Sequence, residues 1–419
     1  MTEPSDAGPL DGVRVLDLSR ILAGPSATQV LGDLGADVIK IEHPERGDDT
    51  RKWGPPFIRD DDGNETSESS YYASANRNKR SVAIDIAQPA GAELVRDLAQ
   101  QSDILVENFK VGGLAKYGLD YESLQDDCPH LIYCSITGFG QTGPYAPRAG
   151  YDFLIQAMGG LMSITGEPHG APMKTGVAVA DLMAGMYAVN GILAALYGRD
   201  CSPDGVGQHI DISLLDTQIA WLSNVGMHAL VSGETPPRLG NAHASIVPYR
   251  VFEVADGHVV IAVGNDRQFA TWCVTAGCPE LATDDRFRTN EGRVRNRKAL
   301  EDQMETIMQK RSQADWIAAM EAAGVPCGPV NTIDQVFDDP HVQTRGMQIV
   351  MPHARAAGGT VPQIASPLQL SGTPVTYRNG PPVLGEHTDE VLQNVLRLNG
   401  ETMDRLRRAG VIKSSSAAP

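Results

Sequence analysis

The chain has few cysteines, and none of them stands in a paired spacing. Its six cysteines include no C-x-x-C and no spacing typical of zinc ligands, which argues against a disulfide framework and a structural zinc centre. The histidines are equally scattered, so we expect no bound metal. Isolated, reduced thiols are typical of a cytoplasmic protein.

The sequence also lacks an excess of positive charge. It has 52 acidic against 35 basic residues and a formal net charge of −17, whereas proteins that bind nucleic acids or anionic membranes carry a basic footprint. The first residues, MTEPSDAGPLDG, have neither the basic nor the apolar region of a signal peptide. We therefore expect a cytoplasmic protein that binds neither nucleic acid nor a membrane. A small anionic ligand is still compatible with this charge.

Two catalytic signatures are missing or incomplete. The G-x-S-x-G of α/β-hydrolases is absent. Residues 137–143 read TGFGQTG and contain the G-x-G-x-x-G of dinucleotide sites after a predicted strand, but Pro144 and Pro147 break the helix that a true fingerprint would open. The sequence therefore favours a glycine loop that lets the backbone approach a ligand, and NAD binding by an oxidoreductase is the weaker alternative.

The order of elements predicts two domains. A chain of 419 residues with 42% hydrophobic and 21% charged residues is long enough for two globular cores. Its first 140 residues alternate strands and helices, with strands at 13–19, 37–42, 81–86, 103–109 and 130–139 and a helix over Ser26–Leu34. This alternation predicts a Rossmann-like α/β domain with a parallel sheet, whose ligand lies outside the carboxyl ends of the strands.

The composition changes after Gly198. The stretch ETPPRLGNAHASIVPY indicates a boundary, and residues 249–264 predict a β-hairpin that turns at Asp256 and Gly257. Helices are expected near 266–277, 297–310 and 313–323, followed by a return to a helix capped by Thr388. We predict a large domain from 10–225 and 335–419, a smaller α+β domain over 230–330, and flexible tails at 1–9 and 413–419.

One carboxylate stands alone in an apolar segment. Between Lys174 and Arg199 the chain reads TGVAVADLMAGMYAVNGILAALYG, and Asp181 is its only acidic residue. Burying an ionised carboxylate is costly unless something compensates it. Asp181 could cap a helix, belong to a buried polar network, or perform chemistry. A membrane span is also possible by length, but Asp181 and Asn190 within it favour a buried helix of a soluble core.

Taken together, the segments resemble the class III coenzyme A transferases, the family of formyl-CoA transferase and carnitine CoA-transferase. The matching pieces follow the family's order over nearly the whole chain: LDGVRVLDLSRILAGP, LGDLGADVIKIEHPERGDDTR, NRNKRS, VENFKVG, SITGFGQTGPY, GVAVADLMAGMYA, GNAHASIVPYRVFEVADG, GVPCGPV and LGEHTDEVL. The carboxy-terminal half is most similar to the branch that transfers CoA from succinyl-CoA to glutarate and related dicarboxylates.

The resemblance implies a reaction and a nucleophile. The family's catalytic aspartate falls on Asp181, so we expect CoA transfer from an acyl-CoA donor, such as succinyl-CoA, to a carboxylic acid through aspartyl anhydride and aspartyl-CoA intermediates. CoA thioesters are then substrates, and no permanently bound cofactor is expected. The family also implies an interlocked homodimer.

The resemblance also implies the residues that contact CoA. Leu22 and Ala23 match the loop after the first strand, Asn108 and Phe109 match the ENF motif, and Tyr151 occupies a neighbouring site position. Two family arginines are replaced by His43 and Lys116, which meet phosphate less specifically than arginine does. The remaining candidates for the phosphates are Arg51 and Arg80.

Two further questions concern the chemistry and the acceptor. Acyl-CoA racemases of the same fold use a His-Asp pair where this chain has Tyr151 and Asp152, and tyrosine cannot replace imidazole at neutral pH. Racemisation or epimerisation is therefore the alternative to transfer. A dicarboxylate acceptor needs a cation for its distal group, and the hypothesised acceptor residues are Arg148, Arg238, Gly240, Asn241 and His243.

Overall fold

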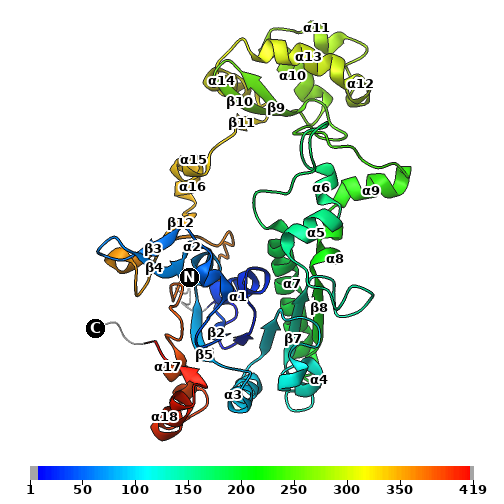
Figure 1. Ribbon diagram of the computed structural model, residues 1–419. Coiled ribbons are helices and arrows are strands. Elements are labelled where there is room, and N and C mark those ends of the chain that lie inside the picture. Colours follow the sequence, from blue (N-terminus) through cyan, green and yellow to red (C-terminus); the bar gives the residue numbers. More distant parts are fainter. Residues whose placement is uncertain (1–7, 416–419) are drawn as a thin grey trace. The chain divides into compact units, whose positions relative to one another are not determined.

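The computed structural model describes residues 8–415, and its largest element is a seven-stranded sheet (Figure 1). The strand order is β14-β5-β2-β1-β6-β7-β8, and all neighbours are parallel except β14, which pairs antiparallel to β5. The order reverses beside β1, as in doubly wound nucleotide-binding sheets. The strands are β1 (Arg14–Asp17), β2 (Asp37–Glu42), β5 (Lys79–Ile84), β6 (Ile104–Glu107), β7 (Ile132–Thr137), β8 (His209–Ser213) and β14 (Ile412–Lys413).

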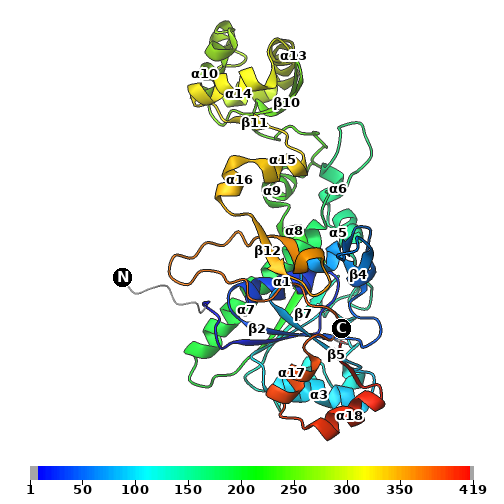
Figure 2. The same ribbon diagram turned by 90° about the vertical axis from the view of Figure 1, so that its left-hand side faces the viewer.

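Helices cover both faces of this sheet, as Figure 2 shows. One face packs against α1 (Ala23–Asp33) and α7 (Val179–Cys201), and the other against α3 (Pro89–Gln100), α17 (Thr388–Asn394) and α18 (Gly400–Arg408). Successive residues of β1 point to opposite faces, so Val15 joins the first core and Leu16 the second. The prediction of an α/β fold with a parallel sheet is confirmed.

Helix α7 is the long apolar segment that contains Asp181. Ala180, Ala184, Ala188 and Ile192 recur at one-turn spacing and are buried against α1 and the sheet. By length and composition α7 could cross a membrane, yet half of its most apolar window is buried inside the protein. Its opposite side exposes large apolar side chains, namely those of Leu182, Met186, Tyr187 and Tyr197.

The chain forms two compact units. Among the described residues, the first contains 8–159, 176–221 and 343–415, and the second contains 160–175 and 222–342. The sequence prediction had placed 160–175 in the large domain. These residues belong to the second unit because the Gly240 amide donates to the Gly166 carbonyl and the Arg238 guanidinium donates to the carbonyls of Glu167 and Gly170.

The second unit has its own core. Its antiparallel sheet has the order β11 (Cys327–Pro329), β10 (Gly257–Ala262), β9 (Tyr249–Val254), and it packs against α10 (Asp266–Ala276), α13 (Arg297–Met308) and α14 (Gln313–Ala323). Trp272 and Trp316 are fully buried there. The hairpin lies where the sequence predicts it, but its two turn residues are Ala255 and Asp256, and Gly257 already begins β10.

Short elements complete the two units. In the first unit these are η1 (Asp49–Lys52), β3 (Phe57–Arg59), β4 (Glu65–Ser69), α2 (Ser70–Ser74), η2 (Ala115–Tyr117), α4 (Tyr121–Leu124), α5 (Asp152–Met158), α8 (Leu214–Ala220), β12 (Gln348–Pro352), η3 (Ala357–Gly359) and β13 (Thr360–Ile364). The other short helices are α6 (Leu161–Ile164), α9 (Ser223–Ser232), α11 (Glu280–Thr283), α12 (Asn290–Arg295), α15 (Ile333–Asp338) and α16 (Pro340–Thr344).

Three local predictions are wrong. Helix α1 begins at Ala23, three residues before the predicted start. Thr388 does not cap α17, because its hydroxyl donates to the Lys413 carbonyl and accepts from the Ala83 amide. Lys413 lies in β14 rather than in a flexible tail. Of the predicted tails at 1–9 and 413–419, residues 1–7 and 416–419 lie outside the described residues.

Candidate active site

A cavity of about 460 Å³ opens at the carboxyl ends of β1, β6 and β7. This is the edge where parallel sheets bind ligands, beside the point where the strand order reverses. Its walls come from the loops that follow these three strands and from the first turn of α7. Of the predicted site residues, it brings together Leu22, Ala23, Asn108, Phe109, Lys116, Arg148, Tyr151 and Asp181.

The loop after β1 forms the first wall. Leu22 and Ala23 lie at the start of α1, and the residue before them, Ile21, has a φ of +73°. The left-handed region is unfavourable for a β-branched side chain and costs about 1–3 kcal/mol. Something in the surrounding structure must therefore hold this loop.

The loop after β6 forms the second wall. Asn108 binds the first loop in both directions, because its side-chain oxygen accepts from the Arg20 amide at 2.9 Å and its amide group donates to the Arg20 carbonyl at 2.6 Å. The turn is fixed by Glu107, whose carboxylate accepts from the Phe109 amide at 2.7 Å. Burial raises the pKa of Glu107 to about 7, although hydrogen bonds from the Ser135 side chain and the Phe109 amide act to lower it.

The glycine loop after β7 forms the third wall. Gly138 and Gly150 meet backbone to backbone, and a Cβ at Gly138 would lie 2.5 Å from the Cα of Gly150. Between them, the Arg148 guanidinium lies 4.5 Å from the centre of the Tyr145 ring. The next helix begins only at Asp152, so this G-x-G-x-x-G does not open a helix as a dinucleotide fingerprint does.

Asp181 lies in the first turn of α7 and is partly buried. It does not cap the helix. The N-terminus is instead bound by Asp152 from α5, whose carboxylate accepts from the Ala180 amide at 2.8 Å and from the Gln156 side chain at 2.7 Å. Burial, and then the negative charge of Asp152, raise the pKa of Asp181 to about 7. This shift is opposite to the one that amides at a helix start would cause by themselves.

Such a carboxylate suits nucleophilic chemistry. The protein has already removed part of the water around this carboxylate, so little further desolvation is needed when it attacks. Near neutral pH a substantial fraction is still ionised and therefore reactive.

The residues predicted to bind the CoA phosphates do not all line the same cavity. His43 lines a second cavity of about 290 Å³. This cavity shares Arg20, Asp49, Phe109 and Tyr117 with the first, so the two are neighbours with a common wall. The Lys116 ammonium lies 4.6 Å from the centre of the Tyr117 ring on that wall.

Arg51 and Arg80 do not line either cavity. The buried Arg51 guanidinium donates to Glu42 at 2.8 Å and to Glu68 at 2.6 Å. Arg80 pairs with Asp37 at 2.6 Å and with Glu390 at 3.0 Å. The structure thus assigns both guanidinium groups to internal ion pairs. The sequence prediction missed this because partners 9 to 310 residues away in the chain become neighbours only in the folded protein.

The hypothesised acceptor residues other than Arg148 belong to the second unit. Arg238 is bound to the carbonyls of Glu167 and Gly170, and Gly240 adopts a φ of +57° in the following turn. Asn241 is exposed, and the His243 Nδ1 accepts from the Ser245 amide at 3.1 Å. Their role stays a prediction.

Sequence reasoning missed residues that surround Asp181. Besides Asp152, the Tyr71 side chain lies within electrostatic reach, since burial and then the charges of Asp181 and Asp152 raise the pKa of Tyr71. Arg20 lines both cavities. The two tyrosines at positions 71 and 72, after the acidic loop, were the only sequence feature that could have indicated this proximity. They lie far from Asp181 in the chain, so nothing in the sequence indicated that Tyr71 lies near it. Over residues 8–415, no group of three or more His, Cys, Asp and Glu could hold a metal ion.

Comparison with known proteins decides the family. The family model described as CoA-transferase family III matches residues 10–388. The chain belongs to CoA-transferase family III. It is therefore a transferase that acts on CoA thioesters and carboxylic acids, as the resemblance predicted.

Individual relatives of this family refine the picture. A succinate–glutarate CoA-transferase of Agrobacterium fabrum is 50% identical over 403 residues, which cover 96% of this chain and 98% of that protein. Human succinyl-CoA:glutarate CoA-transferase is 43% identical and is covered to 90%. The crystal structure of a CAIB/BAIF family protein from Brucella suis has a TM-score of 0.82 at 49% identity and covers 93% of this chain and 100% of its own.

Proposed function

We propose that this enzyme moves CoA from succinyl-CoA, or a similar dicarboxyl-CoA, to a dicarboxylic acid such as glutarate, with Asp181 as the nucleophile. The observation that carries the proposal is the position of a partly buried carboxylate with a raised pKa in the wall of a strand-end cavity. The names of the relatives at 50% and 43% identity support the substrate class.

Asp181 takes part in each of the four steps of the proposed mechanism. Asp181 attacks the thioester carbonyl of the donor, the C–S bond breaks, and an aspartyl-acyl anhydride and CoA thiolate form. The thiolate attacks the aspartyl carbonyl of the anhydride, which releases the donor acid and leaves an aspartyl-CoA thioester. The acceptor carboxylate attacks this thioester, and the thiolate leaves again. It finally attacks the acyl carbonyl of the second anhydride, which gives the new acyl-CoA and restores Asp181.

The two neighbouring cavities support the binding of an extended thioester. We propose that the reactive end occupies the larger cavity, in contact with Leu22, Ala23, Asn108, Phe109 and Tyr151. The nucleotide end would reach the shared wall, where the Lys116 ammonium on one side supplies positive charge for phosphate and the imidazole of His43 on the other can donate a hydrogen bond. Arg51 and Arg80 are left out of this proposal because their charges are already paired.

Arg148 is the proposed partner of the distal carboxylate of the acceptor. It is a cavity-lining arginine with no ion pair to a described residue, and it lies on the aromatic rings of Tyr145 and Phe139. Such a preorganised guanidinium can bind a carboxylate bidentately. The role of the second-unit candidates Arg238, Gly240, Asn241 and His243 in acceptor binding stays a prediction of the sequence.

Racemisation has less support. No imidazole lies among the residues that line the larger cavity, and Tyr151 is 66% exposed. We also propose a homodimer and a cytoplasmic location. The exposed apolar side of α7 supports the dimer, since large contiguous apolar surface is typical of protein interfaces.

The experiment is a transfer assay with separated acyl-CoA products. Succinyl-CoA and glutarate should give glutaryl-CoA, Asp181→Asn should abolish turnover, and Arg148→Gln should raise the KM of glutarate at least tenfold with little change for acetate. Transfer that persists in Asp181→Asn would disprove the nucleophile. An unchanged glutarate KM in Arg148→Gln would disprove the acceptor contact.

A further inference from the structure

The loop from Ser19 to Leu22 has an unusual backbone for its sequence. Ile21 is one of four non-glycine residues with positive φ among residues 8–415, and the others are Asn78, Ser223 and Arg397. It is the only β-branched residue of the four. It directly precedes Leu22 and Ala23, which line the larger cavity.

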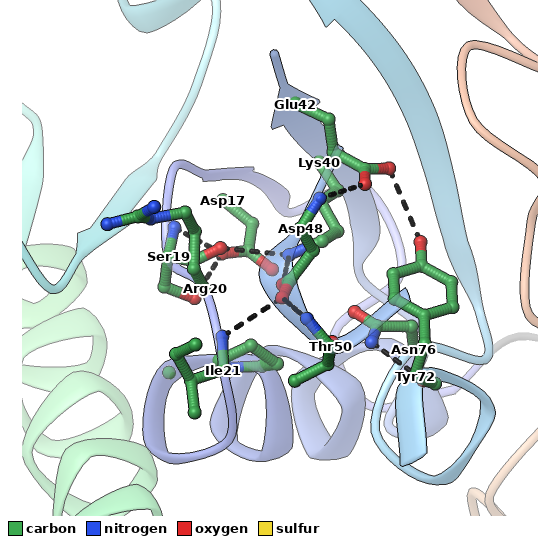
Figure 3. A network of polar contacts seen from close by, with 12 residues as sticks. Asp17, Ser19, Arg20, Ile21, Lys40, Glu42, Asp48, Thr50, Tyr72 and Asn76 are labelled. Carbon is green, nitrogen blue, oxygen red and sulfur yellow. Dashed lines mark hydrogen bonds and ion pairs between the residues drawn. The ribbon is translucent and has the colours of Figure 1, made fainter. Parts of the chain in front are cut away.

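A buried ion pair holds this loop from behind. The Asp48 carboxylate accepts from the Ile21 amide at 3.3 Å, and the Lys40 ammonium donates to the Ser19 carbonyl at 2.8 Å. Lys40 and Asp48 also pair with each other at 3.0 Å. Figure 3 shows both side chains directed at the loop from the end of β2 and the segment after it.

The ion pair has a fixed geometry. Both side chains are fully buried, and Asp48 is further oriented by the Thr50 amide at 3.0 Å and the Thr50 hydroxyl at 2.7 Å. Neither lines the larger cavity, although Asp48 lies in the wall of the smaller one. A buried ion pair is weak evidence for stability, because hydrophobic residues often replace it without loss. Its contacts to the loop point to another role.

The loop is connected to the nucleophile through backbone contact. Gly185 lies one turn after Asp181 on α7, and a Cβ there would meet the Ala23 carbonyl oxygen at 2.7 Å and the Ser26 hydroxyl. Helix α7 therefore rests on the start of α1 without an intervening side chain. A shift of Ala23 must move the turn that carries Asp181.

We propose that Lys40 and Asp48 are positioning residues, which hold Ile21 in its left-handed conformation and thereby fix Ala23, the first turn of α7 and the Asp181 carboxylate. This inference rests on the proposed role of Asp181. It assigns no contact with substrate to either residue.

A double-mutant cycle between positions 48 and 21 tests this role. Asp48→Asn removes the charge opposite Lys40, so the loop relaxes, kcat falls about tenfold, and the KM of the donor changes less than about threefold. Ile21→Gly makes a positive φ readily accessible. In the Ile21→Gly background, Asp48→Asn should therefore lose less than threefold in kcat, while its melting temperature stays lowered.

Asp33 supplies the matched control. Its buried carboxylate pairs with Arg77 at 2.6 Å and lines neither cavity. Asp33→Asn should also lower the melting temperature, but Ile21→Gly should not restore any activity that it loses. Equal losses of kcat for Asp48→Asn in both backgrounds would overturn the proposal, as would the same restoration for Asp33→Asn.

Two additions keep the test decisive. If Asp48→Asn does not fold, Asp48→Glu retains the charge but moves the oxygen that accepts from Ile21, and the same cycle applies. Amide hydrogen exchange over residues 19–23 should increase in the Asp48 variant and not in the Asp33 variant. Because exchange does not depend on turnover, a wild-type protein without transfer activity would refute the proposed function and still leave this inference tested.

Discussion

At the scale of single residues, Asp181 shows what the sequence could and could not predict. Its isolation in an apolar segment was visible in the chain, and the family resemblance supplied its chemical role. Its raised pKa could not be predicted, because the second carboxylate, Asp152, comes from another helix and accepts from the Ala180 amide. The helix cap, which was one of the roles left open for Asp181, is thus performed by Asp152.

This arrangement predicts a pH dependence. Only ionised Asp181 can attack, and its pKa is raised to about 7, so kcat/KM for the donor should rise with pH and level off above about 8. Asp152→Asn removes the like charge while an amide oxygen can still accept from Ala180. The rising limb should then move to lower pH, as measured by initial rates between pH 5.5 and 8.5.

The opposite result for Asp152→Asn would contradict this prediction. A limb that stays in place in Asp152→Asn would show that Asp152 does not set the pKa of Asp181. Glu107 also has a pKa near 7, and it serves as the internal check. Glu107→Gln should leave the limb where it is, since its carboxylate orients the Phe109 amide and does not react.

At the scale of elements, the sequence predicted where the strand-end loops lie, but it did not predict the side-chain contacts within and behind them. The alternation of strands and helices located the ligand edge, and Leu22, Asn108 and Asp181 do meet there. The partners of Arg51 and Arg80 lie up to hundreds of residues away in the chain, as with Glu390. Local sequence carries no signal for such a pair, so it could not show that the Arg51 and Arg80 guanidinium groups are paired within the protein.

The contact between Gly138 and Gly150 predicts that the glycine loop tolerates no side chain. A Cβ at Gly150 would overlap the Cα of Gly138, so Gly150→Ala must displace the loop that carries Arg148. We expect kcat/KM to fall by roughly 10- to 100-fold. Steady-state kinetics with the donor and acceptor varied in turn would measure it.

Gly198→Ala is the corresponding control. Gly198 lies within α7, and a Cβ there meets nothing within 4 Å. Alanine favours a helix over glycine, so activity should be retained and stability should be equal or higher. Wild-type kinetics in Gly150→Ala would mean that the loop is not part of the site.

At the scale of the whole molecule, the parallel sheet and the separate small core followed from pattern alone. Strand periodicity and the alternation with helices were sufficient to predict a parallel sheet, whereas the strand order was seen only in the structure. The assignment of 160–175 to the second unit was not predictable, because it depends on hydrogen bonds from the Arg238 guanidinium and the Gly240 amide. The short edge strand β14 was missed because two residues carry no periodicity.

The exposed side of α7 predicts self-association. Leu182, Met186, Tyr187 and Tyr197 are all exposed on one helix of the chain, and obligate dimers bury such apolar surface. Light scattering coupled to size exclusion should give twice the mass of the chain. Met186→Glu with Tyr197→Glu should shift the protein toward the monomer, whereas a monomeric wild type at micromolar concentration would contradict the dimer.

The central claim is that Asp181 carries CoA covalently, and intact-protein mass spectrometry tests it most directly. After incubation with succinyl-CoA without acceptor, followed by rapid acid quench, the protein should gain the mass of CoA less one water. The adduct should disappear on addition of glutarate and should never form in Asp181→Ala. Full transfer activity without any adduct, or an adduct of the same mass in Asp181→Ala, would contradict the account.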